Sequence, residues 1–279
     1  METSDTKSTG VRGGRPPGSP PLTLVVIPLL VGVVWILEMF LLAENPLLFQ
    51  HYDPAGLVLY TLFAGILVGI IIPLIRIRAA FLSGAVNMFQ IGLRSLRRTV
   101  IAVFLSALAG YACLALITPP GTRVALPGTA FLLLPTAIAA VMICWVFVGT
   151  HIQAYVRTGG ILVSVCTGTI VTAVLFAVAM TVFFPRDIVR ESFLVYLLLG
   201  VLAALFFFAV RDLYAVIVIV SLGLAVIMGP AIDASYLQIS QPVGYLCGLF
   251  TLAVLIGTHV YFSLHYTTIS LEELRKSSP

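Results

Sequence analysis

Glu38 is the one acidic residue well inside a long apolar run, about five residues before the end of the segment 22–43. An ionisable side chain is costly in hydrocarbon, so one inside a membrane span marks a functional site by default. A carboxylate there could couple a proton or another cation to the movement of a solute. The alternative, which the sequence by itself favours, is a tilted helix that lets Glu38 reach the membrane surface with Glu44, a shift of about 7 Å.

Cys166, in the sequence Cys166-Thr167-Gly168, is a second candidate for chemistry, together with Arg211 at the end of a later apolar run. A guanidinium beside a thiol stabilises the thiolate, which is the nucleophilic form of cysteine. Such a thiolate could attack a peptide carbonyl and form an acyl-enzyme. Cys166 and Arg211 are therefore the candidate catalytic residues of an alternative, enzymatic interpretation.

This arrangement resembles the archaeosortase and exosortase family of membrane proteins over about residues 149–257. In that family a Cys-Thr-Gly or Cys-Ser-Gly motif supplies the nucleophile, an arginine follows at a later helix end, and a further His or Arg completes the site. The resemblance implies a membrane-embedded cysteine protease or transpeptidase. The chain departs from the pattern in two ways. Its positive charges place Cys166 near the cytoplasmic face, and the region of the third residue holds Gln241 and Tyr245.

Residues that bind metals or cofactors form no recognisable pattern in this sequence. The 4 cysteines have neither disulfide nor zinc spacing, and the 4 histidines are scattered. A metal or haem that bridges His151 and His259 is an alternative that the helix positions allow. The chain contains no His-Glu-x-x-His motif and no Gly-Lys pair of a phosphate-binding loop. We therefore predict no cofactor and no metal site, and prefer a non-enzymatic function.

The amino-acid composition indicates which kind of secondary structure positions these residues. Hydrophobic residues make up 60% of the chain, charged residues 9%, and the mean hydropathy is +1.13, whereas soluble proteins have roughly 25% charged residues. Backbone polar groups find no water in hydrocarbon, and the apolar runs are far longer than barrel strands. The sequence therefore predicts an all-α integral membrane protein. The net charge of +4 lies in segments that flank the spans, so no nucleic-acid partner is expected.

About eight runs approach the roughly 20 residues that a membrane-spanning helix needs. They form a predicted transmembrane domain over 22–264, between a disordered cytoplasmic tail over 1–21 and a short cytoplasmic tail over 265–279. The predicted spans are 22–43, 57–75, 99–117, 129–150, 160–184, 193–210, 213–229 and 243–264.

Positive charge predicts the orientation of these spans, because cytoplasmic loops carry an excess of Lys and Arg. With the N-terminus inside, 12 of the 15 Lys and Arg residues face the cytoplasm. The opposite orientation would export the five arginines between the second and third spans. We therefore expect a multi-pass protein of the cell membrane, with both termini in the cytoplasm.

Residues 193–229 could form one helix or two. One helix would be about 55 Å long, nearly twice the roughly 30 Å of hydrocarbon, and would carry Arg211 and Asp212 to mid-membrane. We therefore prefer a hairpin, with these two charges at a cytoplasmic tip. There they can pair with each other or meet water and lipid headgroups.

Residues 79–98 separate into an apolar and a polar side on a helical wheel, and the polar side includes Arg94, Arg97 and Arg98. This pattern predicts one amphipathic helix that lies in the cytoplasmic interface, against anionic lipid headgroups. The alternative is that the same surface binds a cytoplasmic partner, such as an ATPase or another membrane subunit.

Pro28, Pro73 and Pro135 interrupt the first, second and fourth spans. Broken helices line the pathways of many transporters, although close packing, as at Gly65-x-x-x-Gly69, is the alternative explanation. Transport is the preferred function: a small permease, or a membrane subunit of a transport assembly. A noncatalytic scaffold and the cysteine transpeptidase remain the alternatives.

Overall fold

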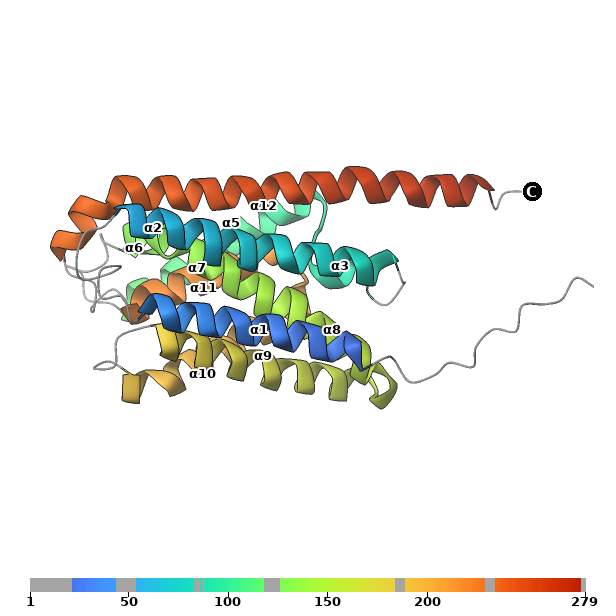
Figure 1. The fold of residues 1–279 in the computed structure, drawn as a ribbon, viewed down its shortest axis with the longest axis horizontal. Helices are drawn as coiled ribbons and strands as arrows, with labels where there is room; N and C mark the ends of the chain where they lie inside the picture. The colour runs from blue at the N-terminus through green and yellow to red at the C-terminus, as the bar shows by residue number, and fades with distance from the viewer. Residues whose placement is uncertain are drawn as a thin grey trace, which may run out of the picture.

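A computed structural model describes residues 22–43, 54–82, 86, 88–117, 126–183, 189–228 and 234–276. Over these residues the chain is helical and has no strand, and its helices form one bundle of roughly parallel and antiparallel rods (Figure 1). The predicted tail over 1–21 lies outside the described residues. In chain order the elements are α1 (Thr23–Ala43), α2 (Pro54–Tyr60), η2 (Thr61–Ile71), α3 (Ile72–Leu82), α4 (Met88–Ile91), α5 (Leu96–Ile117), α6 (Leu126–Leu132), α7 (Leu134–Ala140), η3 (Val141–Gly149), α8 (Thr150–Val156), η4 (Arg157–Gly159), α9 (Ile161–Phe183), α10 (Val189–Val210), α11 (Leu213–Met228) and α12 (Ala234–Lys276).

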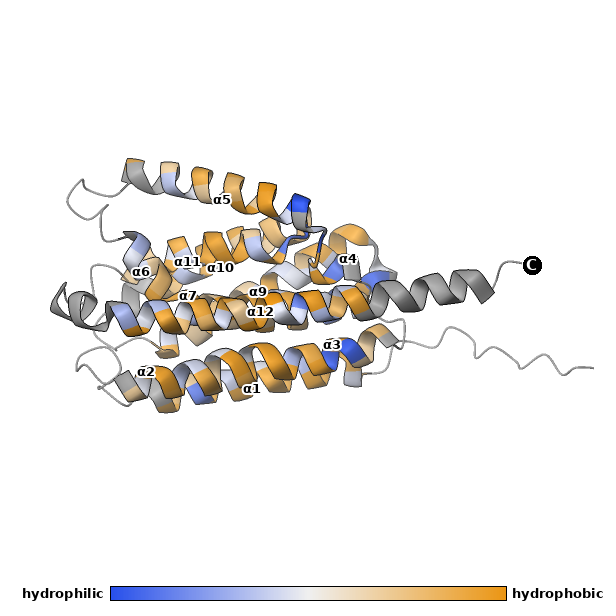
Figure 2. Cartoon of the chain, turned by 90° about the horizontal axis from the view of Figure 1, so that it is seen from above, coloured by the Kyte–Doolittle hydropathy of each residue, from blue (hydrophilic) through white to orange (hydrophobic). Residues whose placement is uncertain are grey.

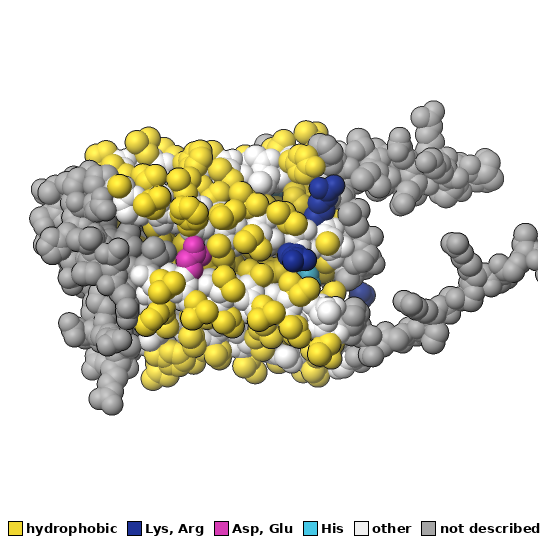
Figure 3. Space-filling view, viewed as in Figure 1, with side chains coloured by type: hydrophobic (Ala, Val, Ile, Leu, Met, Phe, Trp, Pro, Cys, Tyr) yellow, Lys and Arg dark blue, Asp and Glu magenta, His cyan; other side chains and the backbone are white. Residues whose placement is uncertain are grey.

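Several helices are long and apolar enough to cross a membrane, which is compatible with a multi-pass membrane protein. The surface between the ends of the bundle is largely apolar (Figure 3). α11 is apolar but shorter, at 16 residues, and it packs beside α5. The count of eight crossings stays a prediction. Six segments among the described residues meet the length and hydropathy of a span: Thr23–Leu41, Ala55–Phe81, Leu134–Val156, Ile161–Phe183, Phe193–Val210 and Pro242–Leu264.

The segment Leu134–Val156, made of α7, η3 and α8, forms the centre of the bundle. The nine side chains of η3 are all buried. A helix that is apolar on every side has no polar face to turn outward, so it is stable at the centre of a larger assembly. The helices α1, η2, α9 and α11 pack around it. A Cβ at Gly69 of η2 would lie 2.5 Å from the Cβ of Ala139, so these two backbones are in direct contact.

The helices α10 and α11 form an antiparallel hairpin that turns at Arg211 and Asp212. Arg211 has a φ of 54°, the left-handed region, which ends α10. Far from the turn, the Tyr196 hydroxyl donates to the Met228 sulfur at 2.8 Å. Residues at equal distance from the turn therefore meet, and 193–229 is two helices rather than one.

The chain does not form the single amphipathic helix expected over 79–98. α3 ends at Leu82, α4 is a separate helix of 4 residues, and Gly92 has a φ of 84°. That conformation breaks a right-handed helix. Ile91, next to it, is 1% exposed and packs into the protein core. The prediction is therefore wrong for the described part of this segment.

α12 is one helix of 43 residues, about 65 Å long at 1.5 Å per residue. It continues past Leu264, where the sequence analysis expected a separate tail over 265–279, and its backbone stays helical to Lys276. Its C-terminal part extends beyond the other helices (Figure 1).

Basic residues from separate parts of the chain gather at one end of the bundle. Figure 2 shows strongly hydrophilic residues where α3 ends and α5 begins, and α1 starts at this same end (Figure 1). We call this the basic end. The distribution of Lys and Arg predicts that this end faces the cytoplasm. This orientation in the membrane stays a prediction. Its arginines are Arg76, Arg78, Arg94, Arg97, Arg98, Arg157 and Arg211.

Gly92→Ala is expected to destabilise the protein by at least about 2 kcal/mol, because an alanine is strained at this φ and its Cβ would crowd the α10–α11 turn. The added Cβ would lie 3.1 Å from the Leu213 nitrogen. Thermal unfolding in detergent, followed by tryptophan fluorescence, measures the loss.

Gly160→Ala is the matched control, since Gly160 has a φ of 95° but no atom within 4 Å of the added Cβ. It should lose less stability than Gly92→Ala. Equal losses would show that packing at Gly92 contributes nothing.

Candidate functional site

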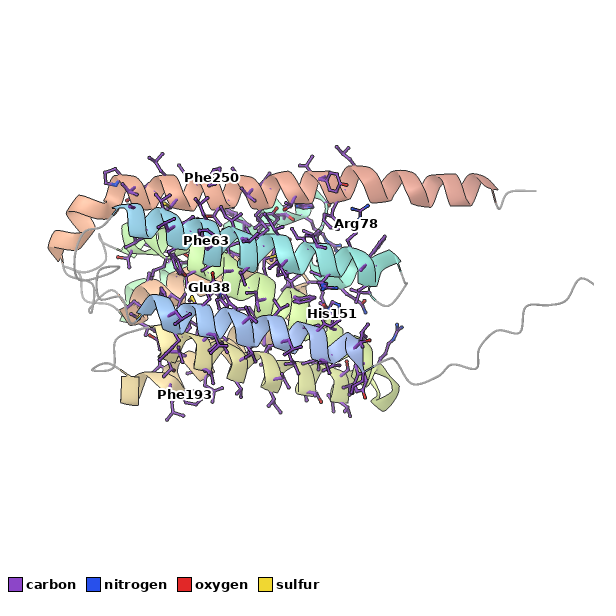
Figure 4. The ribbon with its side chains drawn as sticks, in the orientation of Figure 1. Glu38, Phe63, Arg78, His151, Phe193 and Phe250 are labelled. Atoms are coloured by element: carbon purple, nitrogen blue, oxygen red, sulfur yellow. The ribbon has the colours of Figure 1, made fainter. Side chains whose placement is uncertain are left out.

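Glu38 lies in the half of α1 that is remote from the basic end, on the side that faces α2 (Figure 4). Its side chain is partly buried. The Oε2 atom is fully buried and has no hydrogen-bond partner among the described residues. A buried carboxylate oxygen without a partner is costly, so Glu38 is the first element of a candidate site.

Tyr60, the last residue of α2, packs against α1 next to Glu38. Its hydroxyl is 2.6 Å from Oγ1 of Thr136 and donates to the Met39 sulfur at 3.7 Å. Met39 directly follows Glu38 in α1, so Tyr60 contacts the helical turn that contains the carboxylate. The Tyr60 ring stacks on Phe183, with 5.4 Å between centroids. Four helical segments, α1, α2, α7 and α9, thus meet at the Tyr60 side chain.

The helices next to Glu38 are irregular at the same level. Pro135 lacks a backbone N–H and follows the turn at Leu133, where α6 ends and α7 begins. Thr136 is the next residue. On the other side, the π-helix η2 begins at Thr61, directly after Tyr60. π-helical segments and broken helices occur at functional sites far more often than elsewhere.

Arg211, a candidate catalytic residue, lies at the basic end and is engaged in structural contacts. Its guanidinium donates to Oε1 of Gln153 at 2.6 Å and to the Gln90 carbonyl at 3.2 Å. It also lies 5.2 Å from the centre of the Phe208 ring. Burial lowers the pKa of Arg211, and the neighbouring Arg94 guanidinium lowers it further, although an arginine remains protonated.

Asp212 does not pair with Arg211 as the sequence analysis allowed. It is 2% exposed, so it does not meet water at a tip either. Its Oδ1 accepts from the Ala215 N–H at 3.0 Å, which caps α11, and its Oδ2 accepts from the Thr99 hydroxyl at 2.9 Å.

Arg94 was expected on a docking surface with Arg97 and Arg98. Instead it donates to the carbonyls of Arg211 and Val210, both at 3.1 Å, at the C-terminal end of α10. Arg97 and Arg98, in the first turn of α5, are exposed. Two of the three arginines therefore stay available for contact with lipid or a partner.

The structure does not bring Cys166 to Arg211. Cys166 is exposed on α9. The face of α9 that meets Gln153, the partner of Arg211, contains Ser164 and Gly168, and the Ser164 hydroxyl donates to the Gln153 carbonyl at 3.0 Å. Cys166 is two residues from each of them, about 200° around the helix. The thiol therefore points away from the guanidinium.

The two histidines at the ends of the fourth and eighth predicted spans have separate surroundings. Nδ1 of His151 is bonded to the Phe147 carbonyl at 2.7 Å, while Nδ1 of His259 is bonded to the Tyr214 hydroxyl at 3.0 Å. Among the described residues, no group of three His, Cys, Asp or Glu side chains could hold a metal ion.

Sequence reasoning missed Tyr60 and Thr136, which are 76 positions apart. One local signal was present, because Thr136 directly follows the helix-breaking Pro135.

Searches against protein-family models, curated proteins and solved structures find no match.

Asp212→Ala is expected to cost about 1–3 kcal/mol of stability, because the α11 cap and the acceptor of a buried hydroxyl are both lost. Thermal unfolding of the purified protein measures this. Asp212→Asn keeps one acceptor oxygen and should lose less. Unchanged unfolding of Asp212→Ala would contradict the assigned capping role.

Proposed function

We propose that this chain is a small permease, or the transport subunit of a larger assembly, in which Glu38 binds the coupling ion. The observation that carries the proposal is the buried oxygen of Glu38 that has no described partner. An ionised carboxylate in hydrocarbon needs a counter-charge, and a neutral one needs a proton. A proton or a small cation at Glu38 would satisfy either need.

The surroundings of Glu38 fit the binding and release of such an ion. Tyr60, which contacts Met39 next to Glu38, and Thr136 provide two hydroxyl oxygens, and either hydroxyl can be the donor of their shared hydrogen bond. This pair can therefore reorient when the charge on Glu38 changes. Met39 supplies a further weak acceptor for Tyr60.

The helix breaks support transport over a purely structural role for Glu38. Pro135 lacks the N–H of a helical hydrogen bond and so leaves one carbonyl without its usual partner, although the Leu133 and Ala137 N–H groups keep their bonds to the carbonyls four residues earlier. Discontinuous helices supply ion and substrate sites in many secondary transporters. Here Pro135 and the start of η2 directly adjoin Thr136 and Tyr60, the two residues that share a hydrogen bond.

Glu38→Gln is expected to reduce substrate-driven proton or sodium movement at least tenfold, because the amide cannot take up and release a charge. The measurement uses proteoliposomes that contain a pH-sensitive or sodium-sensitive dye. Amino acids, sugars, organic anions and inorganic ions are added one at a time. Glu38→Asp, which keeps a carboxylate, should retain part of the response.

Tyr60→Phe should also weaken coupling, and Tyr196→Phe is its matched control. Tyr196 is another buried tyrosine, bonded to the Met228 sulfur far from Glu38 along the chain. Full coupling in Glu38→Gln would overturn the role of this residue. A wild-type protein that responds to none of these compounds would contradict the permease itself.

The projecting end of α12 favours a second candidate function, a membrane subunit that carries a cytoplasmic partner. His259 anchors α12 to α11 through Tyr214, and the helix continues well past that point to Lys276. A rigid helix beyond the membrane is a natural attachment point, for example for an ATPase.

Removal of residues 265–279 should abolish co-purification of such a partner without changing the unfolding temperature of the bundle. Mass spectrometry of affinity-purified full-length and truncated chains makes the comparison. A partner that the truncated chain retains would place the contact elsewhere.

A further inference from the structure

A cavity of about 250 Å³ lies at the basic end, between the start of α1, the end of α3 and the central helix. Its walls are mostly apolar, and its polar lining consists of Thr23, Arg76 and His151. On this face a histidine lies close to a basic side chain within a largely apolar surface (Figure 3). Neither the mechanism proposed for Glu38 nor the α10–α11 turn uses this cavity.

His151 lines the cavity and has one ring nitrogen that makes no described hydrogen bond. The side chain is 3% exposed, and Nδ1 is 2.7 Å from the Phe147 carbonyl oxygen. A carbonyl only accepts, so Nδ1 must carry the proton. Nε2 has no partner among the described residues, although the ring lines the cavity. When the ring is protonated, Nε2–H becomes a donor directed at whatever the cavity holds.

The remaining polar groups favour a negatively charged ligand. Arg76 contributes a guanidinium, and among the described residues no acidic side chain lines the cavity. Thr23 and Leu24, the first two residues of α1, also line it, so the positive end of this 21-residue helix faces the same space. An arginine, a histidine and a helix N-terminus together match the oxygens of a phosphate.

The rim of the cavity favours a lipid over a soluble anion. Leu24 and Ile27, two aliphatic residues that line the cavity, are only partly buried. Large aliphatic side chains around the opening fit acyl chains. The volume is below the roughly 300 Å³ at which drug-sized ligands are usually enclosed, so the cavity suits a headgroup whose chains stay outside.

We propose that this cavity binds the phosphate of an anionic membrane lipid, which enters sideways between α1 and α3. Arg76 and the protonated ring of His151 donate to the phosphate oxygens, and the apolar rim contacts the upper acyl chains. Basic pockets between helices at one membrane face bind anionic headgroups in this way. The site is independent of the coupling role proposed for Glu38.

Native mass spectrometry of the detergent-purified full chain tests the site, with phosphatidylglycerol and phosphatidylcholine as probes. The wild type should bind one phosphatidylglycerol at least tenfold more tightly than Arg76→Ala does, and should bind phosphatidylcholine weakly. Ala79→Phe, which fills the cavity from a partly open wall, should also remove binding. His151→Gln should weaken it.

Arg78→Ala is the matched control, because Arg78 lies two residues further along α3 and does not line the cavity. Figure 4 shows it on a different side of α3 from His151. It should bind phosphatidylglycerol within about twofold of the wild type.

Equal loss in Arg78→Ala and Arg76→Ala would overturn the proposal in favour of a general positive surface. Equal affinity for both lipids would show that charge does not select the ligand, and would also overturn it. Displacement of phosphatidylglycerol by millimolar inorganic phosphate would show that the cavity binds a soluble anion rather than a lipid, and would overturn the proposal. Thermal unfolding of each variant verifies that it is folded.

Discussion

The turn between α10 and α11 is buried inside the protein, where water cannot satisfy the free N–H and C=O groups at the two helix ends. Arg94 donates to the last carbonyls of α10, Asp212 accepts the Ala215 N–H, and the Gly92 carbonyl accepts the Leu213 N–H at 3.1 Å. These contacts tie the segment before α5 to the hairpin. The basic end of the bundle is therefore held together by hydrogen bonds that satisfy the backbone N–H and C=O groups at these helix ends.

Because buried polar groups need hydrogen-bond partners, a buried polar atom without a partner is informative. Most polar side chains inside the bundle return a hydrogen bond to their own helix, as Thr172 does to the Gly168 carbonyl at 2.8 Å. Glu38 departs from this rule, as do Trp35, Trp145, Gln153 and Thr169, each with one buried polar atom that has no described partner. Glu38 in α1 and His151 in α8 lie in the seam between α1 and the segment formed by α2, η2 and α3, one toward each end of the bundle (Figure 4). The proposed ion site and the proposed lipid site would therefore share one seam.

Membrane solvation explains why the class of fold was predictable and several sites were not. Apolar length and the absence of water require helices, and the length of 193–229 excluded a single helix. The prediction of one amphipathic helix over 79–98 is wrong because a helical wheel counts Gly92 only as an apolar residue. The role of Gly92 lies in its backbone conformation, which ends the helix. The pairing of Cys166 with Arg211 failed because distance along the chain does not determine which face of a helix a residue occupies.

Local signals for other parts of the site were present in the sequence. Asp212 immediately before an apolar run is a typical N-cap, and this pattern could have separated it from Arg211. The contact between Tyr60 and Thr136 could not have been found in this way, because it depends on how two distant helices pack. Patterns in a single sequence predict where helices end better than they predict which helices contact each other.

The π-helical segments have a mechanical consequence for the basic end. A π-helix forms i→i+5 hydrogen bonds, and conversion of one turn to i→i+4 bonding shifts the winding by one residue. Every residue beyond that turn then rotates by about 100° around the axis, which itself need not tilt. η2 leads directly into α3, which contains Arg76 and Arg78. A one-residue change in hydrogen-bond register in mid-bundle would thus rotate Arg76 by about 100° away from His151 and bring Ile75 or Ile77 toward its place.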